Sequence, residues 1–269
     1  MDRPRLDDRF AMWRAGAAAS ALILCWEVGG RVISEPQLFP WPSYLALISF
    51  PSLAIFGGAA NPDAWIAAVT VLANLGVTLS RICTGLALGL TCGVMMGFGV
   101  FGLTRLCSGE SPLLVLLRSF PLFSLIPLFV FWFAGSEAGV WLYIAFSTSC
   151  VVASGIFQAI LNVPRIYLTQ AKLLGASRVQ QIFSVVVPAI MPELVATARN
   201  VLGLSWAFSL GAEYTATRDG LGHLVYLSYT YADMGKLAVM AVIYSLGGLV
   251  VFFLWGFLVE GKWAWAKSK

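Results

Sequence analysis

Residues 71–102 of the chain read VLANLGVTLSRICTGLALGLTCGVMMGFGVFG, and this stretch decides the fold class. Arg81 is its only charged residue, and most of the other positions are apolar or glycine. Because a helix of about 20 apolar residues crosses the hydrocarbon core of a bilayer, the stretch is long enough to span a membrane. It therefore predicts a membrane-spanning helix.

Glycine recurs at every fourth position within this predicted helix, at Gly85, Gly89, Gly93 and Gly97. Each step of four residues advances a helix by about 40° beyond a full turn, so the glycines form one slanted, smooth ridge. Such a ridge lets a second helix approach closely in lipid. The pattern predicts helix packing and does not indicate a ligand site.

The composition of the whole chain agrees with a membrane protein. Of its 269 residues, 59% are hydrophobic and 11% are charged, and the mean hydropathy is +0.83. Soluble domains carry about 25% charged residues, and disordered chains are polar and poor in aromatic residues, so both classes are excluded. The expected fold is all-α, a polytopic membrane helix bundle of about six transmembrane helices. The expected spans are 16–33, 71–102, 112–134, 138–161, 189–211 and 237–259.

Three local predictions concern the segments between the spans. Three prolines exclude a helix over 35–43, after which Ser43 is expected to cap a short helix ending near Ser49. The Asn61-Pro62-Asp63 motif reads as the cap, first position and acidic first turn of another helix. Residues 213–235 are expected to form a loop.

Basic residues are concentrated in three places, 3–14, 165–178 and 262–269. With an even number of spans, these places lie on one side of the membrane, which the positive-inside rule identifies as the cytoplasm. Both termini and residues 163–188 are therefore expected in the cytoplasm. The net charge of +4 thus reports orientation and does not indicate a nucleic acid partner.

Cysteine and histidine give no sign of a metal site or of catalysis. The five cysteines lack a Cys-x-x-Cys spacing, which argues against zinc and against a disulfide framework. His223 is the only histidine, and packing or an interfacial position is expected of it. The chain has no Gly-x-x-x-x-Gly-Lys-Ser/Thr loop for ATP phosphates. We therefore expect no catalytic residue, no metal and no cofactor bound by this chain.

The polar segment 163–188 differs from the apolar runs on either side of it. It is expected to form two short helices that meet at Gly175, with Ser177 capping the second helix and Pro188 opening the next span. An apolar knob rimmed by basic residues would suit docking into a groove of a soluble protein. The knob residues are Leu173, Leu174 and Ala176, and the rim residues are Lys172 and Arg178.

This segment resembles the coupling loop of ABC importer permeases, which follows the pattern Glu-Ala-Ala, three residues, Gly, nine residues, Ile-x-Leu-Pro. Gly175 and Pro188 match with the family separation, and Ala171 matches the second alanine. Val185 and Val187 conservatively replace Ile and Leu. Two positions depart from the pattern, because Thr169 stands in place of Glu and Gln170 in place of the first Ala. The resemblance implies that residues 171–178, with Val185 and Pro188, dock an ATPase.

Further motifs resemble the branch of these permeases that imports nitrate, taurine, alkanesulfonates and related small solutes, and the similarity extends over nearly the whole chain. The matching stretches are 38–43, 78–81, 118–121, 126–128, 212–213 and 220–224. The resemblance implies a type I ABC importer permease (MetI-like) fold. It also implies three parts: an N-terminal helix with a proline-rich segment over 1–69, the permease domain over 70–260, and a basic cytoplasmic tail over 261–269.

The resemblance implies a permease subunit that is not an enzyme and that moves a small solute across the bacterial cytoplasmic (inner) membrane. The implied partners are two cytoplasmic ATP-binding subunits, which hold ATP and Mg, a periplasmic or extracellular solute-binding protein, a second copy of the permease in a homodimer, and membrane lipid. Sulfonates, nitrate, aromatic acids and pyrimidine precursors stay open as solutes. The alternative is an ATP-independent secondary transporter or channel, but such proteins usually carry mid-membrane ionisable groups, and mid-span acids and histidine are essentially missing here.

Three arginines fall within or near apolar runs, namely Arg81, Arg118 and Arg199. An arginine at the bilayer centre costs about 2.5–3.5 kcal/mol on insertion scales, so structural pairing or snorkelling is expected of them in preference to solute binding. The fifth span carries Ser205, Trp206 and Ser209, and this span borders the translocation path in the fold that the resemblance implies. Lining of that path and ordinary helix packing are both open for these three residues.

Overall fold

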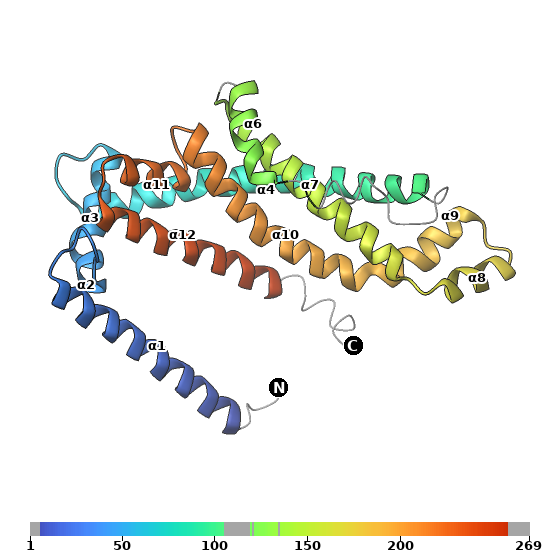
Figure 1. The fold of residues 1–269 in the computed structure, drawn as a ribbon, viewed down its shortest axis with the longest axis horizontal. Helices are drawn as coiled ribbons and strands as arrows, with labels where there is room; N and C mark the ends of the chain where they lie inside the picture. Colours follow the sequence, from blue (N-terminus) through green and yellow to red (C-terminus); the bar gives the residue numbers. More distant parts are fainter. Residues whose placement is uncertain (1–5, 105–118, 120, 134, 258–269) are drawn as a thin grey trace. The chain divides into compact units, whose positions relative to one another are not determined.

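The computed structural model describes residues 6–104, 119, 121–133 and 135–257, which form helices joined by short connections (Figure 1). No strand occurs among these residues, and the all-α prediction is confirmed. The described chain divides into two compact units. The first comprises the residues up to Asn74 together with Leu224–Tyr244, and the second comprises Leu75–His223 together with the residues from Ser245 onward.

Five helices within the described ranges are long and apolar enough to cross a membrane. They are Gly16–Ile33, Ala64–Gly99, Glu137–Asn162, Arg178–Thr215 and Met234–Trp255. These helices correspond to the expected first, second, fourth, fifth and sixth spans. Residues 112–118 of the expected third span lie outside the described ranges, and its later part forms the short apolar helix Leu122–Trp132, which ends in α6 (Ile126–Trp132).

The first unit contains α1 (Leu6–Ile33) and an unbroken series of short helical turns. The turns are α2 (Pro42–Tyr44), a π-helical turn (Leu45–Ser49), α3 (Phe50–Ser52) and a 3-10 turn (Leu53–Gly57). The prediction that Ser43 caps this element is wrong. Trp41 is the cap and Pro42 lies in the first turn, because the fixed φ of proline suits that position. The Ser43 hydroxyl instead donates to Oε1 of Glu27 over 2.7 Å.

The helix α4 (Ala64–Thr104) is continuous, so the helix expected from Asn61 and the expected second span are one element. Its cap is Asp63 and not Asn61. Oδ1 of Asp63 accepts hydrogen bonds from the backbone N–H of Trp65 over 2.7 Å and of Ile66 over 3.0 Å. The carboxylate thus satisfies two of the free N–H groups at the helix start and faces the positive end of the helix dipole.

In the second unit, the glycine ridge of α4 packs against α7 (Glu137–Asn162). A Cβ atom built on Gly85 would lie 2.6 Å from Cγ2 of Ile144, which is too close for any side chain. The other pairs along the ridge are Gly89 with Thr148, Gly93 with Val152, and Gly97 with Ile156. Because the partners on α7 are also four residues apart, the two helices interlock along their length, and the predicted packing role is confirmed.

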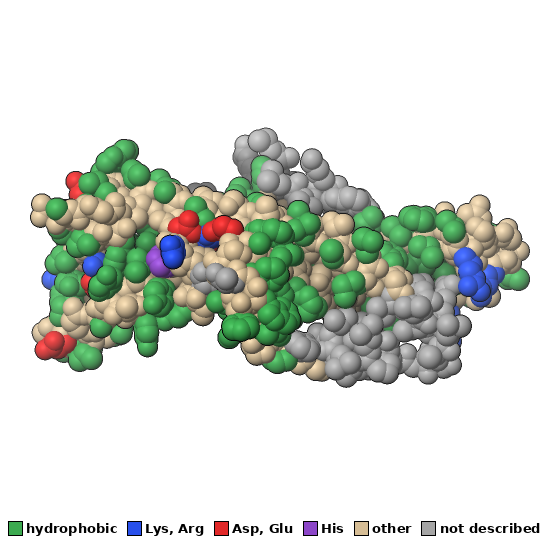
Figure 2. All heavy atoms as spheres, turned by 90° about the horizontal axis from the view of Figure 1, so that it is seen from above, with side chains coloured by type: hydrophobic (Ala, Val, Ile, Leu, Met, Phe, Trp, Pro, Cys, Tyr) green, Lys and Arg blue, Asp and Glu red, His purple; other side chains and the backbone are tan. Residues whose placement is uncertain are grey.

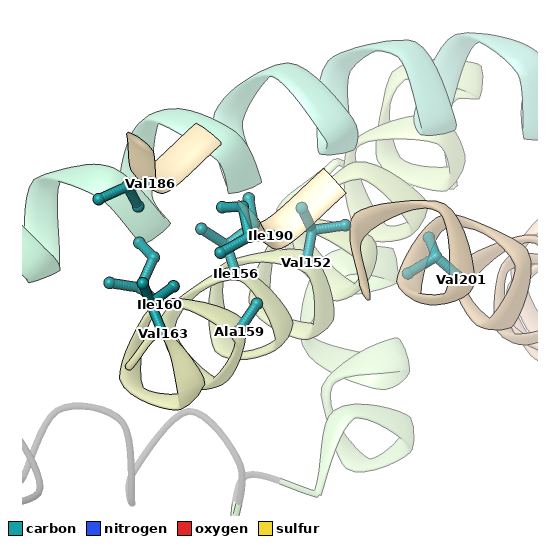
Figure 3. Close-up of a cluster of buried hydrophobic side chains, with 8 residues drawn as sticks. All are labelled: Val152, Ile156, Ala159, Ile160, Val163, Val186, Ile190 and Val201. Carbon is teal, nitrogen blue, oxygen red and sulfur yellow. The ribbon is translucent and has the colours of Figure 1, made fainter. Parts of the chain in front are cut away.

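A cluster of buried aliphatic side chains joins α7 to the start of α10 (Val187–Ala216) in the second unit. Figure 3 shows these side chains pointing toward one another. The cluster consists of Val152, Ile156, Ala159, Ile160, Val163, Val186, Ile190 and Val201. Since lipid is as apolar as these residues, close packing rather than transfer from water stabilises the contact. The cluster fixes the two helices to each other where the segment 163–188 begins and ends.

The span that contains α10 begins earlier than expected. Pro188 lies in the first turn of α10, as predicted. However, α9 (Arg178–Gln181) and a π-helical turn (Ile182–Val186) lead into α10 without a break, so the span covers Arg178–Thr215. The second helix of the polar segment is therefore continuous with a helix of 38 residues, which at about 57 Å is longer than the hydrocarbon core of about 30 Å.

The prediction of a loop over 213–235 is wrong. α10 continues to Ala216, α11 covers Leu221–Thr230, and α12 begins at Met234 and ends at Trp255. The polar residues that suggested a loop include Glu213, which is buried and has partners inside the second unit. Only residues 217–220, named here the connector, separate α10 from α11.

Candidate functional site

The segment 163–188 turns sharply after α8 (Arg165–Leu173). Gly175 adopts φ +78, the left-handed conformation that glycine reaches without steric cost. The N–H of Gly175 donates to the carbonyl oxygen of Lys172 over 3.0 Å, and the N–H of Ala176 donates to that of Ala171 over 3.0 Å. These two bonds close the end of α8 and fix the direction in which the chain leaves it.

A capping box formed by Ser177 and Gln180 starts α9. The N–H of Gln180 donates to Oγ of Ser177 over 3.3 Å, and the N–H of Ser177 donates to Oε1 of Gln180 over 2.8 Å. Nε2 of the buried Gln181 donates to the carbonyl oxygen of Ala176 over 2.8 Å. The predicted turn at Gly175 and the predicted cap at Ser177 are confirmed, whereas the second helix is not short but continues into α10.

The tip of this turn presents apolar side chains away from the fold. Leu173 is 82% exposed and Leu174 is 88% exposed. Ala171 is buried and Ala176 is half-buried, while Lys172 and Arg178 are exposed. Val185 is half-buried and Pro188 is exposed. Figure 2 shows Lys and Arg side chains gathered at the end of the second unit that α8 and α9 form.

The opposite end of α7 and α10 holds a cluster of charges around Arg81 of α4. Nε of Arg81 donates to Oε2 of Glu137 over 2.8 Å, and Nη2 donates to Oε1 of Glu137 and to Oδ1 of Asp219. Nη1 donates to Oε1 of Glu213 over 3.1 Å and to the carbonyl oxygen of Asp219 over 3.0 Å. All five N–H donors of the guanidinium are therefore used.

The three carboxylates around Arg81 differ in their contact with solvent. The side chains of Arg81 and Glu213 are 2% and 0% exposed, whereas those of Glu137 and Asp219 are 63% and 53% exposed. Figure 2 shows acidic and basic side chains side by side on this face. The cluster therefore has a buried ion pair at its centre and two carboxylates at its surface.

Glu213 also holds the start of α11. Its Oε2 accepts hydrogen bonds from the hydroxyl of Thr78 and from the N–H of Gly222, each over 2.9 Å. Oγ1 of Thr78 in turn accepts from the N–H of Leu221 over 2.9 Å. A carboxylate on α10 and a hydroxyl on α4 thus satisfy the N–H groups of Gly222 and Leu221 at the start of α11.

The connector crosses directly over the guanidinium. Gly220 adopts φ +95, and a Cβ atom built on it would lie 2.6 Å from Nη1 of Arg81. The hydroxyl of Thr217 donates to the carbonyl oxygen of Asp219 over 2.7 Å and to that of Glu213 over 3.0 Å. Only glycine fits at position 220, because any side chain would push the connector away from Arg81.

His223 lies next to this cluster at the start of α11 and is partly buried. Burial lowers the pKa of the His223 imidazole, and the positive charge of Arg81 adds to this effect. The charge of Asp219 and a hydrogen bond with the backbone of Thr217 oppose it. Burial therefore favours the neutral form of the imidazole.

Of the three arginines in or near apolar runs, Arg81 is paired structurally, as predicted, and Arg118 lies outside the described residues. The guanidinium carbon of Arg199 lies 4.0 Å from the centre of the Phe252 ring. This distance is typical of a cation–π contact, which partly offsets the cost of a charge within an apolar environment. Arg199 thus joins α10 to α12 in the second unit.

Ser205, Trp206 and Ser209 are buried in the second unit. The Ser205 hydroxyl donates to the carbonyl oxygen of Leu202 over 2.8 Å, and the Ser209 hydroxyl donates to that of Trp206 over 2.9 Å. A Cβ atom built on Gly247 would lie 2.6 Å from Cζ2 of Trp206. The indole therefore packs directly on the backbone of α12.

Within the described ranges, no group of three or more His, Cys, Asp and Glu side chains is arranged to hold a metal ion. The three carboxylates that do converge, those of Glu137, Glu213 and Asp219, are bound to Arg81. Sequence reasoning expected a structural partner for Arg81 but did not identify these residues. The family-like stretches 78–81, 212–213 and 220–224 meet at this point and could have indicated Glu213, whereas Glu137 and Asp219 lie outside them.

Five apolar spans and a protruding, capped helical turn between two of them define a polytopic helical membrane protein. The chain belongs to the family described as binding-protein-dependent transport system inner membrane component, whose model matches residues 89–262. It is therefore a multi-pass inner membrane permease of an ABC importer. The family assignment supports the predicted importer and not the alternative of an ATP-independent transporter.

Two relatives align with most of the chain. The taurine transport system permease protein TauC of Escherichia coli (strain K12) is 28% identical over 246 residues, which are 91% of this chain and 83% of TauC. The formylaminopyrimidine transport permease protein ThiX of Halalkalibacterium halodurans is 25% identical over 235 residues, which are 86% of this chain and 87% of ThiX.

Among solved structures, the fold resembles that of a chain of the inward-facing MetNI methionine ABC transporter. The TM-score is 0.54 at 19% identity, and the match covers 76% of this chain and 99% of that chain. This similarity confirms the expected MetI-like fold.

Proposed function

We propose that residues 163–188 dock a cytoplasmic ATP-binding subunit, and that this chain carries a small solute inward with ATP and Mg held by that partner. The observation that carries the proposal is the protruding tip between α8 and α9, where Leu173 and Leu174 are 82% and 88% exposed. The left-handed Gly175 and the capping box hold this tip in one conformation, so little ordering entropy is lost when it binds. A rigid apolar tip with basic neighbours suits a groove on a soluble protein.

The orientation that we propose places this tip in the cytoplasm. The segment 163–188 carries Arg165, Lys172 and Arg178, and basic residues favour the cytoplasmic side. α7 has 26 residues and is about 39 Å long at 1.5 Å per residue, more than the hydrocarbon core of about 30 Å. Glu137 and the Arg81 cluster then face the side where a solute-binding protein delivers solute. With the third span that the sequence predicts over 112–134 added to the five described helices, the number of spans is even, and both termini then lie in the cytoplasm.

The working assembly that we propose is a homodimer of this permease with two ATP-binding subunits, because each chain offers one docking tip and closed two-fold assemblies are the commonest. The chain itself supplies no catalytic group in this account. For the solute we propose the nitrate, sulfonate and taurine class, supported by the alignment of TauC with 91% of the chain. The burial of Ser205, Trp206 and Ser209 favours helix packing as their role.

Retention of the ATP-binding subunit during purification tests the docking role. The tagged chain is co-expressed with the ATP-binding subunit and extracted in mild detergent. We expect retention by the natural sequence and loss with Leu174→Asp, because a charge at the tip opposes an apolar contact. Gly175→Asp should lose the subunit as well, since it also strains the left-handed turn.

The matched control is Arg165→Gln, at the start of α8 and away from the tip. This variant should retain the subunit. Equal retention by Leu174→Asp and the natural sequence, in particles of the same size, would contradict the docking role, as would failure of the natural sequence to retain any subunit.

A further inference from the structure

Arg81 binds the far ends of the two helices that carry the segment 163–188. Glu137 is the first residue of α7, and Glu213 lies in the last turns of α10. The other end of α7 leads into α8, and the other end of α10 is the continuation of α9. The docking segment therefore connects one end of α7 to one end of α10. The other ends of both helices contact the guanidinium of Arg81.

The two helices have nearly equal lengths along their axes between these points, and α10 contains Pro192 in its interior. From Glu137 to Asn162 and from Glu213 to Val187 the rise of an α-helix amounts to about 38 Å in each case. Both helices are continuous over this length and are joined by the aliphatic cluster near the docking segment. A pair of continuous helices joined at both ends transmits a displacement at one end to the other.

The connector adds a third element at the same guanidinium. Both the side chain and the backbone carbonyl of Asp219 accept from Arg81, while Glu213 and Thr78 hold the residues that follow the connector. A force on the connector therefore acts on α7 through Arg81 and Glu137, and on α10 through Arg81 and Glu213.

We propose that Arg81 is a positioning residue that couples the connector to the segment 163–188 through α7 and α10. Docking of the solute-binding protein at the connector end would then displace the segment 163–188, which contacts the ATP-binding subunit. The coupling inside the chain is independent of partners, whereas its use in transport rests on the proposed function of the docking segment.

The difference in exposure among the carboxylates supplies the test variants. Removal of the Glu213 carboxylate would take away the buried partner of Arg81 and the acceptor for Thr78 and Gly222, and would damage the fold. The side chains of Glu137 and Asp219 are 63% and 53% exposed. Glu137→Gln and Asp219→Asn therefore leave no buried charge without a partner. Each variant removes one carboxylate charge from the cluster, which weakens one link, and leaves Arg81 paired with Glu213.

The first measurement is hydrogen exchange of the backbone amides of residues 165–181, with the full chain in lipid nanodiscs. We expect Glu137→Gln and Asp219→Asn to change exchange there by about two- to thirtyfold, the range of typical long-range coupling. The thermal midpoints should stay close to that of the natural sequence. Asp219→Glu keeps a carboxylate and should restore the natural exchange, and Glu35→Gln removes an exposed acid outside the cluster as a control.

Exchange over 165–181 that equals that of the natural sequence in both variants overturns the proposal, whatever happens at 213–222. So does an equal change with Glu35→Gln. Retention of the ATP-binding subunit separates the two claims. If exchange responds but the natural sequence retains no subunit, the coupling stands and the docking role fails. If the subunit is retained but exchange does not respond, the docking role stands and the coupling fails.

Discussion

Arg81 on α4 and Glu213 on α10 are 132 positions apart in the sequence, and Nη1 of Arg81 donates to Oε1 of Glu213 over 3.1 Å. Both side chains are almost fully withdrawn from solvent, at 2% and 0% exposure. The remaining donors of Arg81 and the remaining acceptor atom of Glu213 are also bonded. The pair therefore links α4, α10 and the start of α11 to one another.

Glu213→Gln should lower the free energy of unfolding by about 1–3 kcal/mol, because the amide nitrogen cannot accept the buried hydrogen bonds that one carboxylate oxygen accepts. A lower thermal midpoint of the detergent-purified chain measures the effect. Arg31→Gln is the control, since the Arg31 side chain is 64% exposed in its pair with Glu27 and exposed pairs contribute about 0–1 kcal/mol. Equal midpoints for the two variants would show that the buried pair does not hold the fold.

Gly93→Ala should destabilise the second unit by about 1–3 kcal/mol, as expected for overpacking. The new Cβ would lie 2.6 Å from Cβ of Val152 and 2.9 Å from the carbonyl oxygen of Ser149. Gly76→Ala is the matched control on the same helix, because nothing lies within 4 Å of its Cβ position. A thermal midpoint for Gly93→Ala at or above that of Gly76→Ala would refute the close approach of α4 and α7.

His223 should make stability depend on pH between neutral and mildly acidic conditions. Since burial lowers the pKa of His223 in the folded chain, the unfolded chain binds this proton more readily. The contribution of His223 to stability is complete above the unfolded pKa of about 6.5 and is lost as the pH falls below it. His223→Gln should therefore show a smaller fall in thermal midpoint than the natural sequence on acidification. An equal or larger fall in the thermal midpoint of the variant would contradict the predicted direction of the pH effect.

Ser177→Ala should weaken the start of α9 by about 1 kcal/mol, because it removes the hydroxyl that accepts from the N–H of Gln180. Faster hydrogen exchange over 178–181 measures this loss. Ser184→Ala, an exposed serine in the adjoining π-helical turn, is the control. Unchanged exchange in Ser177→Ala would mean that the capping box does not order the docking tip.

Features that depend on neighbours in the sequence could be predicted. The four-residue spacing of Gly85 to Gly97 indicated a packing ridge, and Gly175 with Ser177 indicated the turn between two short helices. In each case the deciding property, a missing Cβ or a hydroxyl three residues before an N–H, is local. The aliphatic content of each span was likewise sufficient to locate five of the membrane helices.

Features that depend on distant residues could not be predicted in the same way. The prediction of a loop over 213–235 was wrong because charged residues such as Glu213 are usually exposed to water. In the fold, Glu213 is buried and hydrogen-bonded to Thr78, 135 positions away. The cap expected at Ser43 was wrong because Glu27, on α1, takes the Ser43 hydroxyl. Local propensity therefore predicted plausible caps and loops, but contacts with residues distant in the sequence determined which of them form.

ATP-dependent uptake into vesicles tests the central claim most directly. The chain, its ATP-binding subunit and its solute-binding protein are reconstituted, and radiolabelled taurine uptake is followed with ATP on the side of residues 163–188. The account predicts uptake that requires ATP on that side and the binding protein on the other, and that is lost with Leu174→Asp. Solute movement by the chain alone, without ATP and driven by an ion gradient, would contradict the account and favour an autonomous transporter.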